Sequence, residues 1–108
     1  ARYAYNAVHQ LLNKKIEVVP MGIKEGVIAS IPIISVNEQQ ENIHTVSLYV
    51  GAARQEEYYD FIINLAPKRV IFNPGTENPQ FAQKLNKAGI SWENACTLVL
   101  LSTNQYQS

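Results

Sequence analysis

The sequence has little cysteine, little charge and no long apolar run, and each shortage excludes a class of protein. A single cysteine, Cys96, cannot form an intrachain disulfide or a metal site made only of cysteines. Nine basic and nine acidic side chains leave no net charge, which argues against general binding of nucleic acid or membrane surfaces. No apolar run could span a bilayer, and no secretory signal is recognisable. We therefore expect a cytoplasmic protein.

Signature motifs of common cofactor and metal sites are missing as well. The sequence contains neither a P-loop nor a G-x-G-x-x-G motif. Its two histidines, His9 and His44, have no carboxylate or thiol at a spacing that is typical of metal ligands. We therefore predict no metal site, and the residues assign no catalytic side chain.

What the sequence does contain is enough apolar material for one globular domain, which we expect to cover residues 1–108. Apolar residues make up 46% of the chain, a composition typical of globular proteins. Periodicity and turn residues predict the following elements: helices over 1–13, 54–65, 79–88 and 95–102, strands over 16–21, 45–50, 69–72 and 90–93, and an irregular stretch with one short edge strand over 23–42.

Helices and strands alternate along the chain, and this order predicts an α/β fold with a doubly wound parallel sheet and helices on both faces. The clearest helix is 54–65, where an apolar stripe at helical spacing places Tyr58 in the core and Tyr59 outside it. The chain opens with a helix, whereas a doubly wound domain normally opens with a strand.

The stretch from Arg69 to Pro79 carries the strongest functional signal. A short apolar strand is followed by an Asn-Pro-Gly turn and then by a helix start at Asn78 and Pro79. Ligands of α/β proteins bind at such junctions, at the carboxyl ends of parallel strands. Loop amides and the positive end of the helix dipole favour anions there.

Three stretches of this sequence resemble a known family. They are Val70-Ile71-Phe72-Asn73-Pro74-Gly75-Thr76-Glu77-Asn78-Pro79, then Lys87-Ala88-Gly89-Ile90, and then residues 93–101. Together they are similar to the small bacterial CoA-binding-domain proteins, a stand-alone relative of the CoA-binding domain of the succinyl-CoA synthetase α subunit. The stretches 46–50 and 53–59 resemble the third strand and following helix of that family, and residues 1–6 resemble the stretch after its first glycine loop.

The resemblance implies a three-layer, Rossmann-like domain that binds CoA or an acyl-CoA across the carboxyl edge of its sheet. The first strand of the family and its phosphate-binding glycine loop are absent from the printed sequence. We expect roughly a dozen further residues before Ala1, enough for a strand of about 5–6 residues and a turn.

By the same resemblance, four loops and the start of the chain would reach the ligand. The candidate binding residues are Arg2, Gly22, Lys24, Tyr49, Gly51, Arg54, Asn73, Pro74, Gly75 and Cys96. Each also has a plainer explanation: a lone loop lysine such as Lys24 is commonly just solvated, and a cysteine such as Cys96 is more often a small apolar residue than a nucleophile.

Three functions stay open at this point. The first is non-catalytic binding of CoA or acyl-CoA. The second is an enzyme, or an enzyme subunit, that acts on a CoA thioester through Cys96 or a residue of a partner. The third is a Rossmann-like domain for another nucleotide such as NAD, which Pro20-Met21-Gly22 disfavours because no acidic residue stands there to hold a ribose. The sequence does not choose between a homodimer and an unidentified protein partner.

Overall fold

The computed structural model describes residues 2–14, 27–28, 31–32, 43–103 and 105–106. They divide into two compact units. The first combines Ala1–Glu38 with Leu98–Ser108, and the second is Gln39–Thr97. The predicted strand over 16–21 lies outside the described residues, as do Gly22 and Lys24. One domain over 1–108 stays a prediction.

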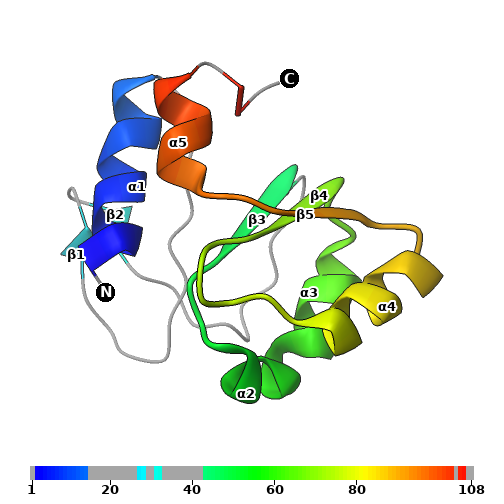
Figure 1. Cartoon of the computed structure of the whole chain (residues 1–108). Helices are drawn as coiled ribbons and strands as arrows, with labels where there is room; N and C mark the ends of the chain where they lie inside the picture. Colours follow the sequence, from blue (N-terminus) through cyan, green and yellow to red (C-terminus); the bar gives the residue numbers. More distant parts are fainter. Residues whose placement is uncertain (1, 15–26, 29–30, 33–42, 104, 107–108) are drawn as a thin grey trace. The chain divides into compact units, whose positions relative to one another are not determined.

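The described elements confirm the α/β class (Figure 1). In chain order they are α1 (Arg2–Asn13), β1 (Val27–Ile28), β2 (Ile31–Pro32), β3 (Thr45–Leu48), α2 (Ala52–Gln55), the 3₁₀ turn η1 (Glu56–Tyr58), α3 (Tyr59–Leu65), β4 (Arg69–Phe72), α4 (Pro79–Lys87), β5 (Ser91–Asn94) and α5 (Thr97–Ser102).

The first unit contains α1 and the hairpin of β1 and β2. The apolar stripe of α1 buries Ala7, Val8 and Leu11, as its spacing predicts. In the stretch 23–42 we expected one short edge strand, but the four residues described there form two, paired antiparallel with Val27 opposite Pro32. Two apolar pairs separated by two residues are too short for periodicity to reveal a hairpin.

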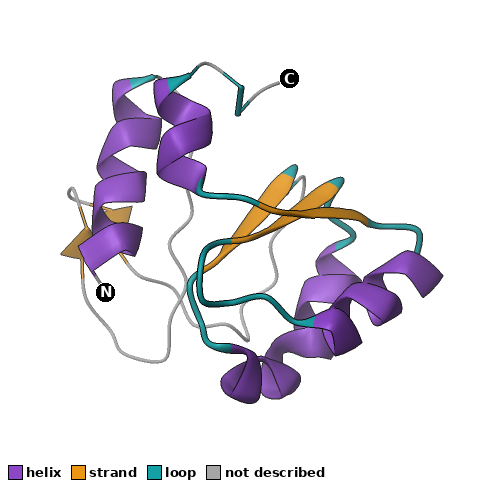
Figure 2. Cartoon of the chain, viewed as in Figure 1, coloured by secondary structure: helices purple, strands orange, loops and turns teal. Residues whose placement is uncertain are grey.

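The second unit is built on a parallel sheet in the order β3-β4-β5 (Figure 2). The register pairs Thr45 with Arg69 and Arg69 with Ser91, and the pairing continues residue by residue to the ends of the strands. As a result, all three carboxyl ends lie at one edge of the sheet. The predicted strand over 69–72 is confirmed with its bounds, and the strands predicted over 45–50 and 90–93 are confirmed with shifted ends.

One face of this sheet holds the core of the unit, beneath α3 and α4 (Figure 1). Phe81 is fully buried at the centre of this core. Its ring stacks on Tyr59 with 4.3 Å between the ring centroids, and it lies edge to face with Phe72 with 5.9 Å between the centroids. The remaining buried members of this cluster are Leu48, Ile62, Val70, Leu85 and Ile90. The strands supply alternate residues to it, as a half-buried sheet requires.

The placement of the two tyrosines of helix 54–65 was wrong. Tyr59 is buried in the core, whereas Tyr58 is only partly buried at its margin. The reason is η1, which interrupts the predicted helix over Glu56–Tyr58. A 3₁₀ turn has 3.0 residues per turn rather than 3.6, so three residues turn the helix about 60° further than in an α-helix and change which side chains face inward. In α4 the buried side chains are Phe81, Ala82 and Leu85, whereas Ala88 follows the helix end and is exposed.

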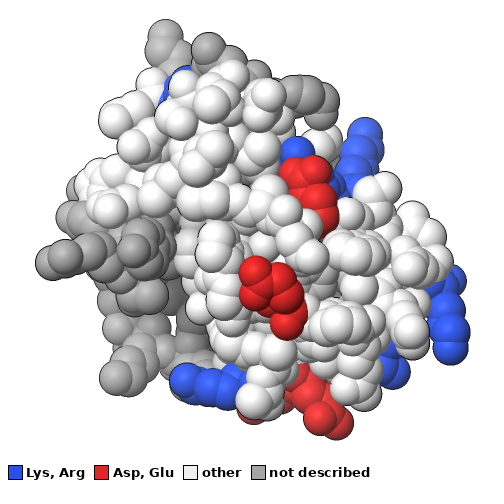
Figure 3. Space-filling view, in the orientation of Figure 1, with Lys and Arg blue, Asp and Glu red and all other residues white. Residues whose placement is uncertain are grey.

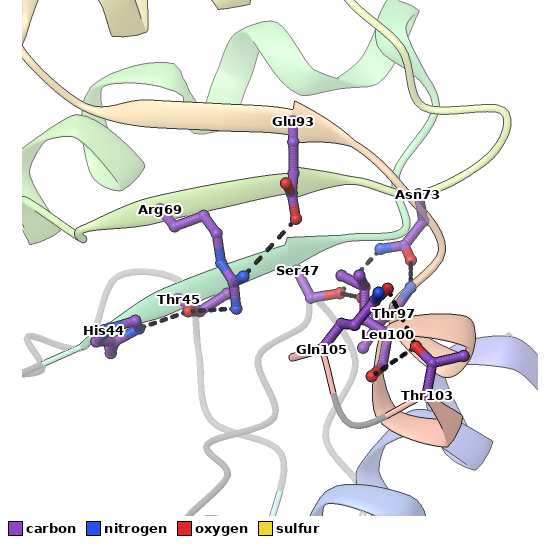
Figure 4. Close-up of polar contacts among 10 residues, drawn as sticks. All are labelled: His44, Thr45, Ser47, Arg69, Asn73, Glu93, Thr97, Leu100, Thr103 and Gln105. Carbon is purple, nitrogen blue, oxygen red and sulfur yellow. Dashed lines mark hydrogen bonds and ion pairs between the residues drawn. The ribbon is translucent and has the colours of Figure 1, made fainter. Parts of the chain in front are cut away.

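The opposite face of the sheet is polar near its amino end. Figure 4 shows a row that crosses all three strands, in which His44 and Arg69 both contact the Thr45 hydroxyl and Arg69 pairs with Glu93 at 3.7 Å. Because the Glu93 side chain is 44% exposed, this ion pair contributes little to stability.

Charged side chains are scattered over the face shown in Figure 3 and form no broad patch of one sign. Among the described residues, no helix has the length and apolar character needed to cross a membrane.

Candidate functional site

The candidate site is the carboxyl edge of β3, β4 and β5, where three loops leave the sheet. The β3–α2 loop contains Tyr49 and Gly51, the β4–α4 loop runs from Asn73 to Asn78, and the β5–α5 loop contains Cys96. Seven of the ten predicted site residues lie in these loops or in α2, directly after the first loop. They are Tyr49, Gly51, Arg54, Asn73, Pro74, Gly75 and Cys96. The structure thus brings together chain segments more than 40 residues apart.

Asn73, directly after β4, connects this strand end to β3 and to the first residue of α5 (Figure 4). Its amide nitrogen donates to the Ser47 hydroxyl and to the Leu48 carbonyl, both at 2.8 Å. Its amide oxygen accepts from the backbone N–H of Thr97, also at 2.8 Å. Asn73 is only 3% exposed, and its side chain makes these hydrogen bonds within the protein and not to solvent. Its role in the site is therefore to position the loops.

Gln55 makes a second connection, between the β3–α2 and β4–α4 loops. Its amide nitrogen donates to the Val50 carbonyl at 2.8 Å and to the Thr76 carbonyl at 2.7 Å. Its oxygen accepts from Asn78, which also donates to the Tyr59 hydroxyl. Gln55 is fully buried, and each of these polar groups finds a partner. Such a satisfied network holds two loops rigidly against the core.

Local signals explain the course of the β4–α4 loop. Asn78 caps α4 by accepting from the Phe81 N–H, and Pro79 occupies the first helical position. The backbone N–H and the hydroxyl of Thr76 both donate hydrogen bonds to the Asn73 carbonyl. Gly75 stands between them with a φ of +89°, a conformation that residues with a Cβ rarely adopt.

Gly75→Ala is expected to lower the free energy of unfolding by about 1–2 kcal/mol, since alanine is strained at this φ. Steric overlap does not add to this cost, because open space surrounds the position of the missing Cβ. Gly51→Ala is the matched control: Gly51 has open space too, but its φ of −60° suits any residue. Urea unfolding measures the free energy of unfolding of both variants. Equal decreases in the two would contradict the assignment of strain to Gly75.

Tyr49 and Cys96 lie near each other at this edge. The Tyr49 hydroxyl is buried, and within the described residues it makes no hydrogen bond. Burial raises its pKa, and the nearby Cys96 adds to that effect, while the hydroxyls of Ser47 and Thr97 offset part of it. Tyr49 is therefore a neutral phenol at physiological pH. Cys96 itself is partly buried.

Gly51 and Arg54 extend the edge toward solvent. Gly51 precedes α2 in an extended conformation, so this turn does not need a glycine for its backbone geometry. The Arg54 side chain is exposed, and its backbone N–H donates to the Gly51 carbonyl at 2.9 Å. The helix begins at Ala52, two residues before the predicted start. Arg2 lies in α1 of the first unit, and its side chain is outside the described part.

Sequence reasoning missed the polar residues that support the loops. These are Ser47, Gln55, Thr76 and Thr97. Ser47 carried a usable signal, because it is a polar residue inside an apolar strand. Gln55 carried none, since glutamine in a helix is usually exposed.

The second unit also has a groove of about 230 Å³ between α4 and β5. Ala82, Asn86 and Trp92 line it, and the Trp92 indole N–H donates to Asn86 at 3.0 Å. The groove touches Glu77 and Asn78 but none of the predicted site residues. No group of three or more metal-ligating side chains occurs within the described ranges. The strand ends remain the best candidate site.

Comparison with known proteins agrees with the α/β fold. A family model described as a CoA binding domain matches residues 1–102. A crystal structure of an uncharacterised protein shares 41% identity with a TM-score of 0.92, over 95% of this chain and 85% of that chain. A hypothetical protein from Pyrococcus horikoshii OT3 shares 24% identity with a TM-score of 0.83, over 93% of this chain and 72% of that chain. A Thermus thermophilus protein shares 18% identity with a TM-score of 0.82, over 95% and 79%. The last two show the fold alone. No curated protein sequence matches the chain.

Proposed function

The chain belongs to the family of CoA-binding domains, and from this premise we propose that it binds CoA or an acyl-CoA at the carboxyl edge of β3, β4 and β5 without catalysing a reaction. The observation that supports this location is the Asn73 network, in which one buried side chain after β4 joins β3 to the first residue of α5. Loops held in place before the ligand arrives lose little conformational entropy on binding.

The ligand is an anion, and one described cation suits it. Arg54 follows the β3–α2 loop and is exposed. Within residues 43–103, the other cations stand elsewhere: Lys68 and Arg69 lie at the amino end of β4, and Lys84 and Lys87 lie in the last turn of α4. We assign Arg54 to a phosphate of the ligand, since a guanidinium binds phosphate through paired hydrogen bonds.

Binding without catalysis is the simpler proposal for this edge. Cys96 is partly buried, a setting in which cysteine commonly behaves as a small apolar side chain. The Tyr49 phenol, with its raised pKa, is a poor base at neutral pH. In the proposal both residues line the ligand instead of reacting with it, alongside Gly51, Pro74 and Gly75.

Calorimetric titration tests the proposal, with CoA and acetyl-CoA as ligands and NAD and ATP as controls. We expect CoA to bind and the two controls to bind more weakly. Arg54→Ala should weaken CoA binding about 10-fold, the loss of roughly 1.4 kcal/mol from one exposed charged contact. Lys68→Ala removes an equally exposed cation from the opposite end of the sheet and should leave the affinity unchanged.

Three results would count against this function. A folded protein that binds no CoA would leave the family and the fold in place but remove the ligand. Equal weakening by Arg54→Ala and Lys68→Ala would mean that general attraction, and not a contact at this edge, holds the nucleotide. Turnover of acetyl-CoA that disappears in Cys96→Ala would replace the binding module with an enzyme.

A further inference from the structure

The β4–α4 loop has an acidic side chain at the place where a ligand anion would be expected. Glu77 is exposed, and its carboxylate oxygen Oε1 accepts the backbone N–H of Gly75 at 3.0 Å. This is the same glycine turn that marked the loop as a candidate anion site. The protein therefore supplies its own anion to the Gly75 amide.

Two further amides, one in the loop and one in the first turn of α4, also have partners within the protein. The Thr76 N–H donates to the Asn73 carbonyl at 2.9 Å, and the Phe81 N–H donates to the Asn78 cap at 3.1 Å. Pro74 and Pro79 have no N–H to offer. A phosphate that approached the Gly75 amide would have to displace the Glu77 carboxylate and would meet its negative charge.

We propose that Glu77 is a specificity-determining residue, which weakens the binding of phosphate-bearing ligands by occupying the Gly75 amide and repelling their charge. This inference rests on the proposed CoA binding. Its consequence is that the β4–α4 loop faces an uncharged polar part of the ligand, and that the phosphates are held elsewhere along the edge. The carboxylate is solvent-exposed, so its repulsion acts within a Debye length of about 8 Å at physiological salt.

Two substitutions separate the two parts of this effect. Glu77→Gln removes the charge and keeps an oxygen that can accept from Gly75, and we expect it to bind CoA about 3-fold more tightly at low salt. Glu77→Ala also frees the Gly75 amide, and its affinity for CoA should rise by at least as much, up to about 10-fold. Pantetheine, which has no phosphate, should bind both variants and the parent protein alike. Calorimetry with CoA and pantetheine at two salt concentrations measures all of these.

Asp60→Asn is the matched control, because it removes one exposed negative charge from α3, away from the loop. It should not change the affinity for CoA. A gain in affinity cannot come from damage to the fold, so this readout separates specificity from structure. Unchanged or weaker binding of CoA by folded Glu77→Gln, while the parent protein binds, would overturn the role of Glu77 alone. No binding by any variant or by the parent would overturn the proposed function and this inference with it.

Discussion

Asn73→Ala is expected to lower the free energy of unfolding by about 3–4 kcal/mol and to abolish measurable CoA binding. The substitution removes three hydrogen bonds and leaves the Leu48 carbonyl and the Thr97 N–H without their partner in a buried setting. Each unsatisfied buried group costs about 1–3 kcal/mol. The strand ends would then lose the side chain that sets their spacing, and the binding loops would have to be ordered by the ligand.

Urea unfolding measures the loss as a lower midpoint with an unchanged slope. Asn64→Ala provides the control, since Asn64 is an exposed asparagine of α3 and its loss should change stability by less than about 0.5 kcal/mol. Asn73→Asp keeps the shape and the oxygen that accepts from Thr97, but sets an oxygen against the Leu48 carbonyl. We expect the free energy of unfolding of Asn73→Asp to lie between those of the parent protein and Asn73→Ala. A loss below about 1 kcal/mol in Asn73→Ala would show that the network is dispensable.

Phe81→Ala is the second large effect, with an expected loss of about 3–5 kcal/mol. The ring is fully buried and packs on Tyr59 and Phe72, so its removal leaves a cavity as well as less apolar contact. Phe81 is also the third residue of α4, and its backbone N–H is the one that the Asn78 cap accepts. Loosening this helix should therefore weaken ligand binding indirectly, through the β4–α4 loop.

Phe61→Ala makes the comparison specific, because Phe61 packs against the same core but is only partly buried. Phe61→Ala should lower the free energy of unfolding by about half as much as Phe81→Ala, or by less. Thermal and urea unfolding of the two variants compare them directly. Equal losses would mean that size alone, and not the central position of Phe81, determines the effect.

The fold was predictable wherever the signals were local. Strand 69–72 is a short apolar run with turn residues after it, and α4 has a capping asparagine, a proline at its first position and a glycine after its end. These features act within a few residues, so the sequence alone reveals them. Tyr59 was misplaced because the 3₁₀ turn before it depends on packing and has no clear sequence marker.

The candidate site was predictable by location but not by mechanism. The strand ends could be found, because parallel strands align their carboxyl ends and loops follow them. The partners of Asn73 and Gln55 could not be found, since they lie up to 26 residues away in the chain. Glu77 was likewise hidden: its spacing from Gly75 is short, but whether the carboxylate folds back onto that amide is a matter of three-dimensional loop geometry.

The order of the three parallel strands has a consequence for how the second unit folds. β3, β4 and β5 are neighbours both in the sheet and in the chain, so each new strand docks beside the one made just before it. The pairing of Thr45 with Arg69, and of Arg69 with Ser91, closes only a little over twenty residues each time. Short closures cost less chain entropy than long ones, and local topology speeds folding. We therefore expect the three strands to dock in chain order, with the hydrogen bond from the Thr97 N–H to the Asn73 oxygen closing the carboxyl edge last.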